Sequence, residues 1–314
     1  MKQIDGIPSL ILCALFWSTG GILVKLVDWN PFAIAAIRSL IAGIFIAITI
    51  KGAPLFRIKK EDGTTDPKGT ACLWAAGICY SLTMVLYVSA NKLTTAANTI
   101  LLQYTNPVYI ILFGPLMLGE KNRKSDYLAA LGVTAGMILF FSDGLESGNQ
   151  TGNILAACSG LTFGFTTLFM RKQQIYGCSS AHSFMIAHIL TLAAGIPFMI
   201  SAGMPSAKSC AGLVLLGIFQ MGIPSVTYSL GIKRVRALTA SFITMLEPLM
   251  NPVWVIIFAG EYPSVKCAAG GALILGTIAA RAVFQHRSAR TRNSHLKNSQ
   301  KDKSCAGFCG RHSC

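Results

Sequence analysis

Long apolar stretches alternate with short polar segments along residues 7–284 of the chain. A helix that crosses the hydrocarbon core of a bilayer needs roughly 20 predominantly apolar residues. Ten stretches come close to this length: 7–27, 31–50, 70–91, 95–118, 126–142, 152–170, 181–201, 210–231, 236–260 and 265–284. The pattern predicts an all-α integral membrane protein with ten transmembrane helices.

The composition favours the same interpretation. Of 314 residues, 53% are apolar and only 12% are charged, whereas charged residues make up about 25% of a typical soluble domain. A soluble core cannot absorb that much apolar surface, but a bilayer can. The lipid bilayer is therefore the first partner that the sequence predicts.

The net charge of +15 is distributed unevenly over the predicted loops. If the N-terminus is cytoplasmic, 22 of the 27 Lys and Arg residues fall on the cytoplasmic side, and only Lys92, Lys208 and Lys266 fall opposite. Lys25 and Arg38 lie within apolar stretches. This bias matches the positive-inside rule. It predicts a multi-pass protein of the cell membrane with both termini in the cytoplasm, and no nucleic-acid partner.

The two halves of the chain repeat one another. Residues 87–120 match residues 228–261 at an offset of 141, which pairs Tyr87 with Tyr228, Lys92 with Lys233, Pro107 with Pro248, Gly119 with Gly260 and Glu120 with Glu261. Residues 17–25 match residues 163–171 at an offset of 146. Because each set has five helices, the second set must be inverted in the membrane, as in many secondary transporters. The sequence predicts five-helix units at 7–142 and 150–284, followed by a disordered basic tail at 285–314.

The same positions carry a family resemblance. The chain resembles the EamA family of the drug/metabolite transporter superfamily through Trp17-Ser18, Lys25, Arg38, Gly119-Glu120, Leu246-Glu247-Pro248 and Gly260-Glu261. The resemblance implies two EamA units around a central cavity, and export or exchange of a small metabolite, amino-acid-like or another small organic solute. Asn251-Pro252 adds a helix breaker that the family pattern lacks.

Two polar stripes lie at equivalent positions of the repeats. Thr95, Thr99, Gln103 and Asn106 share one helix face, and Ala240, Thr244, Glu247 and Asn251 share the matching face. Such stripes are typical of the walls of a water-filled cavity. Ser, Thr, Asn and Gln also join neighbouring helices by hydrogen bonds, so interhelical bonding is the alternative.

Glu247 is the one carboxylate predicted deep in the membrane, roughly 17 Å along a ~30 Å core. It could carry a coupling proton, bind a substrate amine or pair with a basic side chain; the alternative is a neutral glutamic acid bonded to a neighbouring helix. Pro107 and Pro248 each free the carbonyl four residues earlier, which predicts broken helices beside the cavity or plain kinks.

Arg38 lies about 10 Å from the outer end of its predicted helix. It could hold an anionic substrate group, or clamp a backbone carbonyl or a gate carboxylate. Trp17, Tyr87 and Tyr228 could line or gate the cavity, with lipid contact or core packing as the alternative.

Other functions leave no signature in the sequence. A multi-pass membrane enzyme would need aspartate clusters or metal-ligand spacings, a channel would need filter residues from several subunits, and an ATP-driven pump would need a phosphate-binding loop. No such motif is found, so no cofactor or metal is expected. A secondary transporter working by alternating access is the favoured prediction, and a membrane enzyme or a non-transporting membrane protein is the alternative.

Overall fold

The computed structural model describes residues 6–20, 23, 27–50, 56–59, 63–144, 149–259 and 264–284. The elements are α1 (Ile7–Ser18), α3 (Pro31–Thr49), α4 (Pro67–Leu93), α5 (Ala96–Gln103), α6 (Asn106–Leu118), α7 (Lys124–Phe141), η2 (Ser142–Gly144), α8 (Gln150–Ile175), α9 (Ala181–Ala202), α10 (Ala207–Leu215), η3 (Leu216–Gly222), α11 (Ile223–Ile232), α12 (Ala237–Thr244) and α13 (Leu246–Ala259). A further helix, Val265–Phe284, follows α13 and is called the C-terminal helix below. The described residues contain no named strand, so the predicted all-helical class is confirmed.

Eight helices in the described residues are long and apolar enough to cross a bilayer. They are α3, α4, the α5–α6 pair, α7, α8, α9, the run from Ala207 to Ile232, and the C-terminal helix. Two more apolar helices, Ile7–Ser18 and Ala237–Met250, lie where the first and ninth spans are predicted and are shorter. The predicted tail at 285–314 lies outside the described residues.

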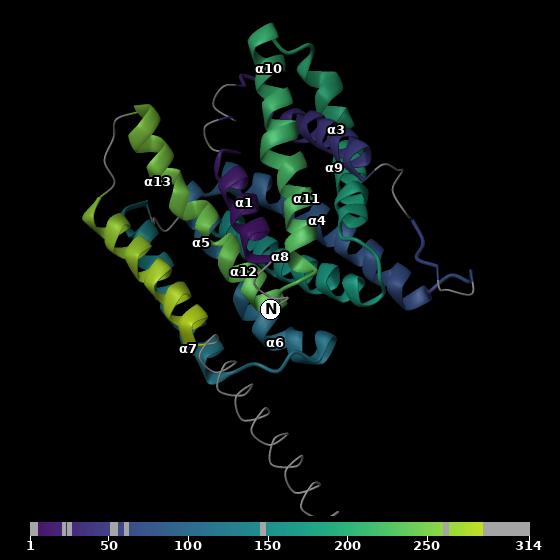
Figure 1. The fold of residues 1–314 in the computed structure, drawn as a ribbon. Coiled ribbons are helices and arrows are strands. Elements are labelled where there is room, and N and C mark those ends of the chain that lie inside the picture. The colour runs from purple at the N-terminus through teal and green to yellow at the C-terminus, as the bar shows by residue number, and fades with distance from the viewer. Residues whose placement is uncertain are drawn as a thin grey trace, which may run out of the picture.

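The helices form a bundle with two flanks (Figure 1). α3 lies beside α9 on one flank, and α7 and the C-terminal helix lie on the other. The central cluster of buried side chains joins α1, α4, α8, α9 and α11, and a second cluster joins α6, α7, α12 and the C-terminal helix. A small polar residue begins several of the helices: Asn30, Asp66 and Asn149 cap α3, α4 and α8 by accepting bonds from the first free backbone N–H groups.

Two helices break at equivalent points of the repeat. α5 ends at Gln103 and α6 begins at Asn106, while α12 ends at Thr244 and α13 begins at Leu246. The bounds of α5, 96 and 103, become those of α12, 237 and 244, when 141 is added. The helix after each break carries a proline in its first turn, Pro107 or Pro248. The offset found in the sequence therefore recurs in the backbone.

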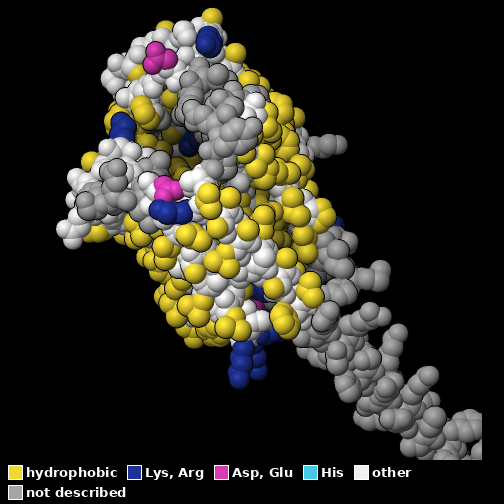
Figure 2. Space-filling model, turned by 90° about the vertical axis from the view of Figure 1, so that its left-hand side faces the viewer, with side chains coloured by type: hydrophobic (Ala, Val, Ile, Leu, Met, Phe, Trp, Pro, Cys, Tyr) yellow, Lys and Arg dark blue, Asp and Glu magenta, His cyan; other side chains and the backbone are white. Residues whose placement is uncertain are grey.

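The outer surface is rich in large apolar side chains. Ile48, Leu116, Leu128, Leu131 and Ile200 are each at least 69% exposed, which a soluble protein could not sustain at many sites. Figure 2 shows hydrophobic side chains over the middle of the flank that holds α7, α13 and the C-terminal helix, with charged side chains toward its ends and a hollow in its upper half. This surface suits a lipid environment.

Candidate functional site

The carboxylate of Glu247 meets the broken helix of the first half. Glu247 lies in the first turn of α13, and its Oε2 accepts a hydrogen bond of 2.6 Å from the Tyr104 hydroxyl. Tyr104 is the residue that caps α5, at the break before α6. Both breaks thus supply a polar side chain to one contact. A Glu that stays half-buried in the bundle needs such a donor or water, because an isolated charge is costly there.

Asn106 lies at the start of α6, beside this contact in the chain. Its side chain is fully buried, and both its amide nitrogen and its amide oxygen lack a hydrogen-bond partner among the described residues. An unpaired buried amide costs free energy, so the position suits water or a solute. Gln103 is half-buried at the end of α5.

Two other members of the predicted stripes are bonded within their own helices. The hydroxyl of Thr99 donates to the Thr95 carbonyl, and that of Thr244 donates to the Ser241 carbonyl. Both side chains are almost fully buried. Their polar groups are thereby satisfied locally.

The predicted aromatic residues occupy different surroundings. Trp17 and Tyr228 are buried in the central cluster, with ring centroids 5.7 Å apart, and Trp17 also meets Phe163 at 6.2 Å. Trp17 and Phe163 correspond at the offset of 146. The Tyr228 hydroxyl bonds Thr167 at 3.0 Å. Tyr87 is half-buried on α4.

Arg38 is half-buried on α3, and its Nη1 donates to Gln220 Oε1 at 3.1 Å. The side chain of Asn251, together with Lys25 and Glu261, lies outside the described residues.

One end of the bundle carries an ionic cluster made of Glu120, Asp126, Arg171, Arg236 and Arg281. Glu120 pairs with Arg171 at 3.2 Å and with Arg236 at 3.8 Å. Asp126, which is fully buried, pairs with Arg236 at 3.3 Å and with Arg281 at 2.9 Å.

Backbone contacts extend the ionic cluster. Arg171 donates to the Ile232 and Lys233 carbonyls, Arg236 donates to the Lys121 carbonyl, and Glu120 accepts from the Ala237 N–H. Both acids come from residues 119–126 of the first half, and all three arginines come from the second half. The cluster therefore ties the two halves together at this end.

At the other end lies a weaker, exposed pair, Lys266 with Asp143 at 2.9 Å. Hydrogen bonds from Ser264 and Lys266 hold the pKa of the Asp143 carboxyl below its usual value. Exposed pairs of this kind contribute little stability.

Several of these residues escaped the sequence analysis. The sequence around four of them is ordinary apolar or loop sequence: Tyr104, Gln220, Asp126 and Arg281. Only Gln220 could have been found, because a polar side chain inside a predicted span is costly. Trp254, whose Nε1 donates to Ser18 Oγ at 2.8 Å between α13 and α1, carried no signal either. Their importance arises from neighbours far away in the sequence.

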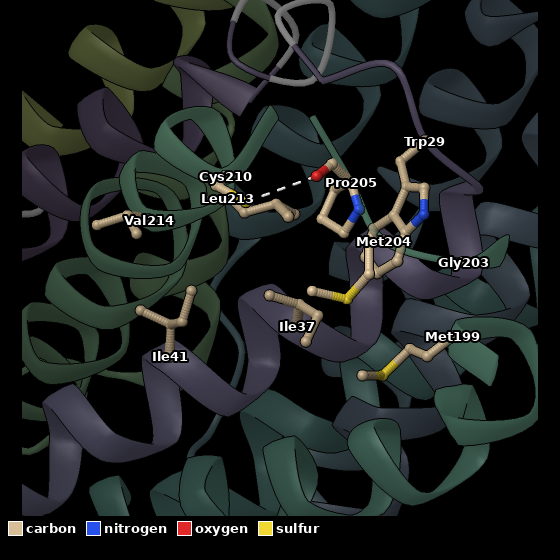
Figure 3. A pocket seen from close by; sticks show the side chains of 10 residues that line it. All are labelled: Trp29, Ile37, Ile41, Met199, Gly203, Met204, Pro205, Cys210, Leu213 and Val214. Carbon is tan, nitrogen blue, oxygen red and sulfur yellow. Dashed lines mark hydrogen bonds between the residues drawn. The ribbon is translucent and has the colours of Figure 1, made fainter. Parts of the chain in front are cut away.

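An apolar groove of about 390 Å³ lies between α3, the end of α9 and α10. Figure 3 shows side chains such as Trp29, Ile37, Ile41 and Met204 around it, with a dashed line from Cys210 to the Pro205 carbonyl. Its lining holds no charged group. The groove therefore has no charged group with which to recognise a solute, and Arg38 of α3 is not part of its lining. Among the described residues, no group of three or more His, Cys, Asp or Glu could hold a metal ion.

Comparison with known proteins identifies the class. The EamA-like transporter family matches residues 5–142 and 150–280, so the chain belongs to this family. It is 25% identical over 292 residues to an uncharacterized transporter of Clostridium kluyveri, which covers 87% of this chain and 92% of that protein.

A second relative is the aromatic amino acid exporter YddG of Ancylobacter novellus, 23% identical over 64% of this chain and 72% of that protein. A solved protein structure shares the fold with a TM-score of 0.73 at 22% identity, covering 91% of this chain and 99% of the other. The chain is thus a multi-pass membrane protein of a small-solute transporter family, and both the predicted family and the transport class are confirmed.

Proposed function

We propose that the protein is a secondary transporter that moves a small organic solute by alternating access between two inverted five-helix units, 7–142 and 150–284, with ten spans in all. The hydrogen bond between Tyr104 and Glu247 carries this proposal, because it joins the two broken helices inside the bundle. Broken helices at membrane depth are tolerated where they border water or substrate. In transporters with inverted repeats, such breaks form the binding site.

The polar groups at the breaks are assigned to solute binding or coupling. Glu247, Asn106 and Gln103 contact the solute or its water, with Tyr87 and Arg38 on neighbouring walls. Thr99, Thr244, Asn251, Trp17 and Tyr228 shape the site, and Pro107 and Pro248 hold the breaks open. Glu247 is also the candidate for proton coupling. An enzyme that used Glu247 for acid–base catalysis would need a second titratable group beside it. Among the described residues, the hydrogen-bond partner of Glu247 is Tyr104.

We propose that the solute is amino-acid-like and that transport is outward, because a relative of this chain is an aromatic amino acid exporter. A comparison of metabolites released by cells that lack or overexpress the protein would identify the solute. Reduced release in the deletion strain and increased release in the overexpressing strain support export.

Uptake into proteoliposomes under an imposed pH gradient tests the role of Glu247. Glu247→Gln keeps the shape of the side chain and removes its ionisation. We expect it to abolish pH-driven accumulation of the exported solute while the protein still inserts and folds. Wild-type accumulation with wild-type pH dependence would exclude coupling at Glu247.

The ionic cluster is assigned to the cytoplasmic end, as the excess of Lys and Arg on that side predicts. Cysteine labelling at residue 122, beside the cluster, tests this orientation in a background without reactive native cysteines. Labelling only from the cytoplasmic side supports inverted units with cytoplasmic termini. Labelling only from outside contradicts both.

A further inference from the structure

Arg38 is a cation that the described protein leaves largely without acceptors. Among the described residues it donates one hydrogen bond, to the Gln220 amide oxygen, its Nε is buried without a partner, and it has no carboxylate partner. A guanidinium inside a membrane protein is costly unless it meets an anion, a carbonyl or water. No backbone carbonyl of the described residues accepts a bond from Arg38.

His188 on α9 faces α3, the helix that carries Arg38. It is 1% exposed, and neither ring nitrogen has a hydrogen-bond partner among the described residues. Its ring lies edge-on to Tyr80 at 6.3 Å, and its Cβ lies beside Gly43 of α3, five residues after Arg38. A neutral imidazole carries one N–H donor, so His188 brings an unused donor to this face of α3.

Gln220 reaches Arg38 because of an irregular helix. η3, Leu216–Gly222, is a π-helix between α10 and α11, and π-turns recur at functional sites. Gly217 lies against Ile41 and the Arg38 carbonyl, and Gly222 lies against Phe45, so η3 packs tightly on α3. Gln220 gives its amide oxygen to Arg38. Its amide nitrogen lies against the backbone of Gly20, where an added Cβ would be 3.0 Å away, and it remains a donor.

The three side chains together offer N–H donors and one fixed positive charge. Of the two acceptors in the group, Gln220 Oε1 is already bonded to Arg38, and the unprotonated ring nitrogen of neutral His188 is the other. A guanidinium is shaped to bind a carboxylate through two parallel bonds. Glu247 bonds Tyr104 rather than Arg38.

We propose that Arg38, His188 and Gln220 form a subsite that binds the carboxylate of the transported solute. The proposal rests on the proposed transport function and specifies its solute class as organic acids, including amino acids. Arg38 supplies the charge and the bidentate contact, His188 supplies a further donor, and Gln220 fixes the plane of the guanidinium. The Glu247 contact at the helix breaks binds or couples at a separate place.

Matched acids and amides test the subsite. The full-length protein in detergent is titrated with L-phenylalanine, L-threonine and succinate, and with their primary amides, while its thermal unfolding temperature is recorded. At least one acid should raise this temperature, and its amide should not. Stabilisation by acid and amide alike, or by none of the acids, would overturn the proposal.

Three variants locate the binding. Arg38→Gln should weaken binding of that acid at least tenfold. His188→Gln and Gln220→Leu should each weaken it about fivefold, the factor that one hydrogen bond of typical strength provides. Arg57→Gln, which removes an exposed arginine between α3 and α4, serves as the control and should bind normally. If Arg38→Gln does not fold, the His188 and Gln220 variants decide, and unchanged affinity in both contradicts the subsite.

Counterflow in proteoliposomes separates this proposal from the broader one. One outcome is exchange of a solute that has no carboxylate, where Glu247→Gln abolishes the exchange and Arg38→Gln leaves it intact. This outcome would contradict the subsite and support the transport function. If no solute is exchanged by the wild-type protein or by either variant, the transport function itself is contradicted.

Discussion

Single residues decide how the interior of the bundle tolerates charge. Glu247 has Tyr104, Asp126 has two arginines, and Arg38 has only the amide of Gln220. The first two groups are satisfied by the protein itself. Arg38 and the unpaired Asn106 and His188 are not. Buried polar groups are normally paired, so we expect a solute or water to bind at the unpaired ones.

Tyr104→Phe tests the contact at the helix breaks. The change keeps the aromatic ring and removes the 2.6 Å bond to Glu247. Because a hydrogen bond inside a membrane protein contributes about 0.6 kcal/mol on average, we expect little change in the amount of folded protein. We expect the rate of solute exchange in proteoliposomes to fall severalfold.

A double-variant cycle gives the decisive readout for this bond. If Tyr104 acts through Glu247, Tyr104→Phe should add little to the effect of Glu247→Gln. Independent, additive losses would show that the bond does not serve transport. Tyr127→Phe, at an exposed tyrosine of α7, is the matched control and should exchange at the wild-type rate.

The helical elements follow the sequence closely where apolar length and end caps determine them. Each predicted stretch contains a helix, and Asn30, Asp66 and Asn149 begin theirs as local caps. The prolines paired at the offset of 141, Pro107 and Pro248, predicted matching helix breaks. The π-helix and the partners of Glu247 and Asp126 were not predictable, because they depend on contacts between residues more than 100 positions apart. Local propensity carries no record of such contacts.

Pro248→Ala tests the broken element of the second half. Alanine restores the N–H group and removes the ring that prevents a continuous helix, so α12 and α13 can join and shift Glu247 away from Tyr104. We expect exchange to fall at least tenfold while expression is maintained. Pro197→Ala is the control, because Pro197 lies inside α9 and does not end it. Equal losses in both variants would mean that the break has no special role.

The two halves of the chain are linked at one end by the ionic cluster and at the other by the exposed pair of Lys266 and Asp143. Asp126 is fully buried with two arginines, and removing one partner of a buried ion pair typically costs about 3–5 kcal/mol. We therefore expect Asp126→Asn to lower the unfolding temperature and the yield of folded protein. Glu120 is 18% exposed in its pairs with Arg171 and Arg236, so its loss should leave the fold intact and act on the closure of this end.

Glu120→Gln thus separates closure from folding. A cysteine at position 103, at the α5 break, reports access from the ionic-cluster end when inside-out vesicles are treated with a membrane-impermeant thiol reagent. Glu120→Gln weakens two links between the halves, the pairs with Arg171 and Arg236. A state closed at this end would then lose stability, and more molecules would be open at this end without any ligand. We expect labelling at position 103 to become severalfold faster in Glu120→Gln. Lys266→Gln removes an ion pair of similar length at the opposite end and should leave that rate unchanged. Equal labelling rates in both variants would mean that the cluster only stabilises the fold and does not control closure.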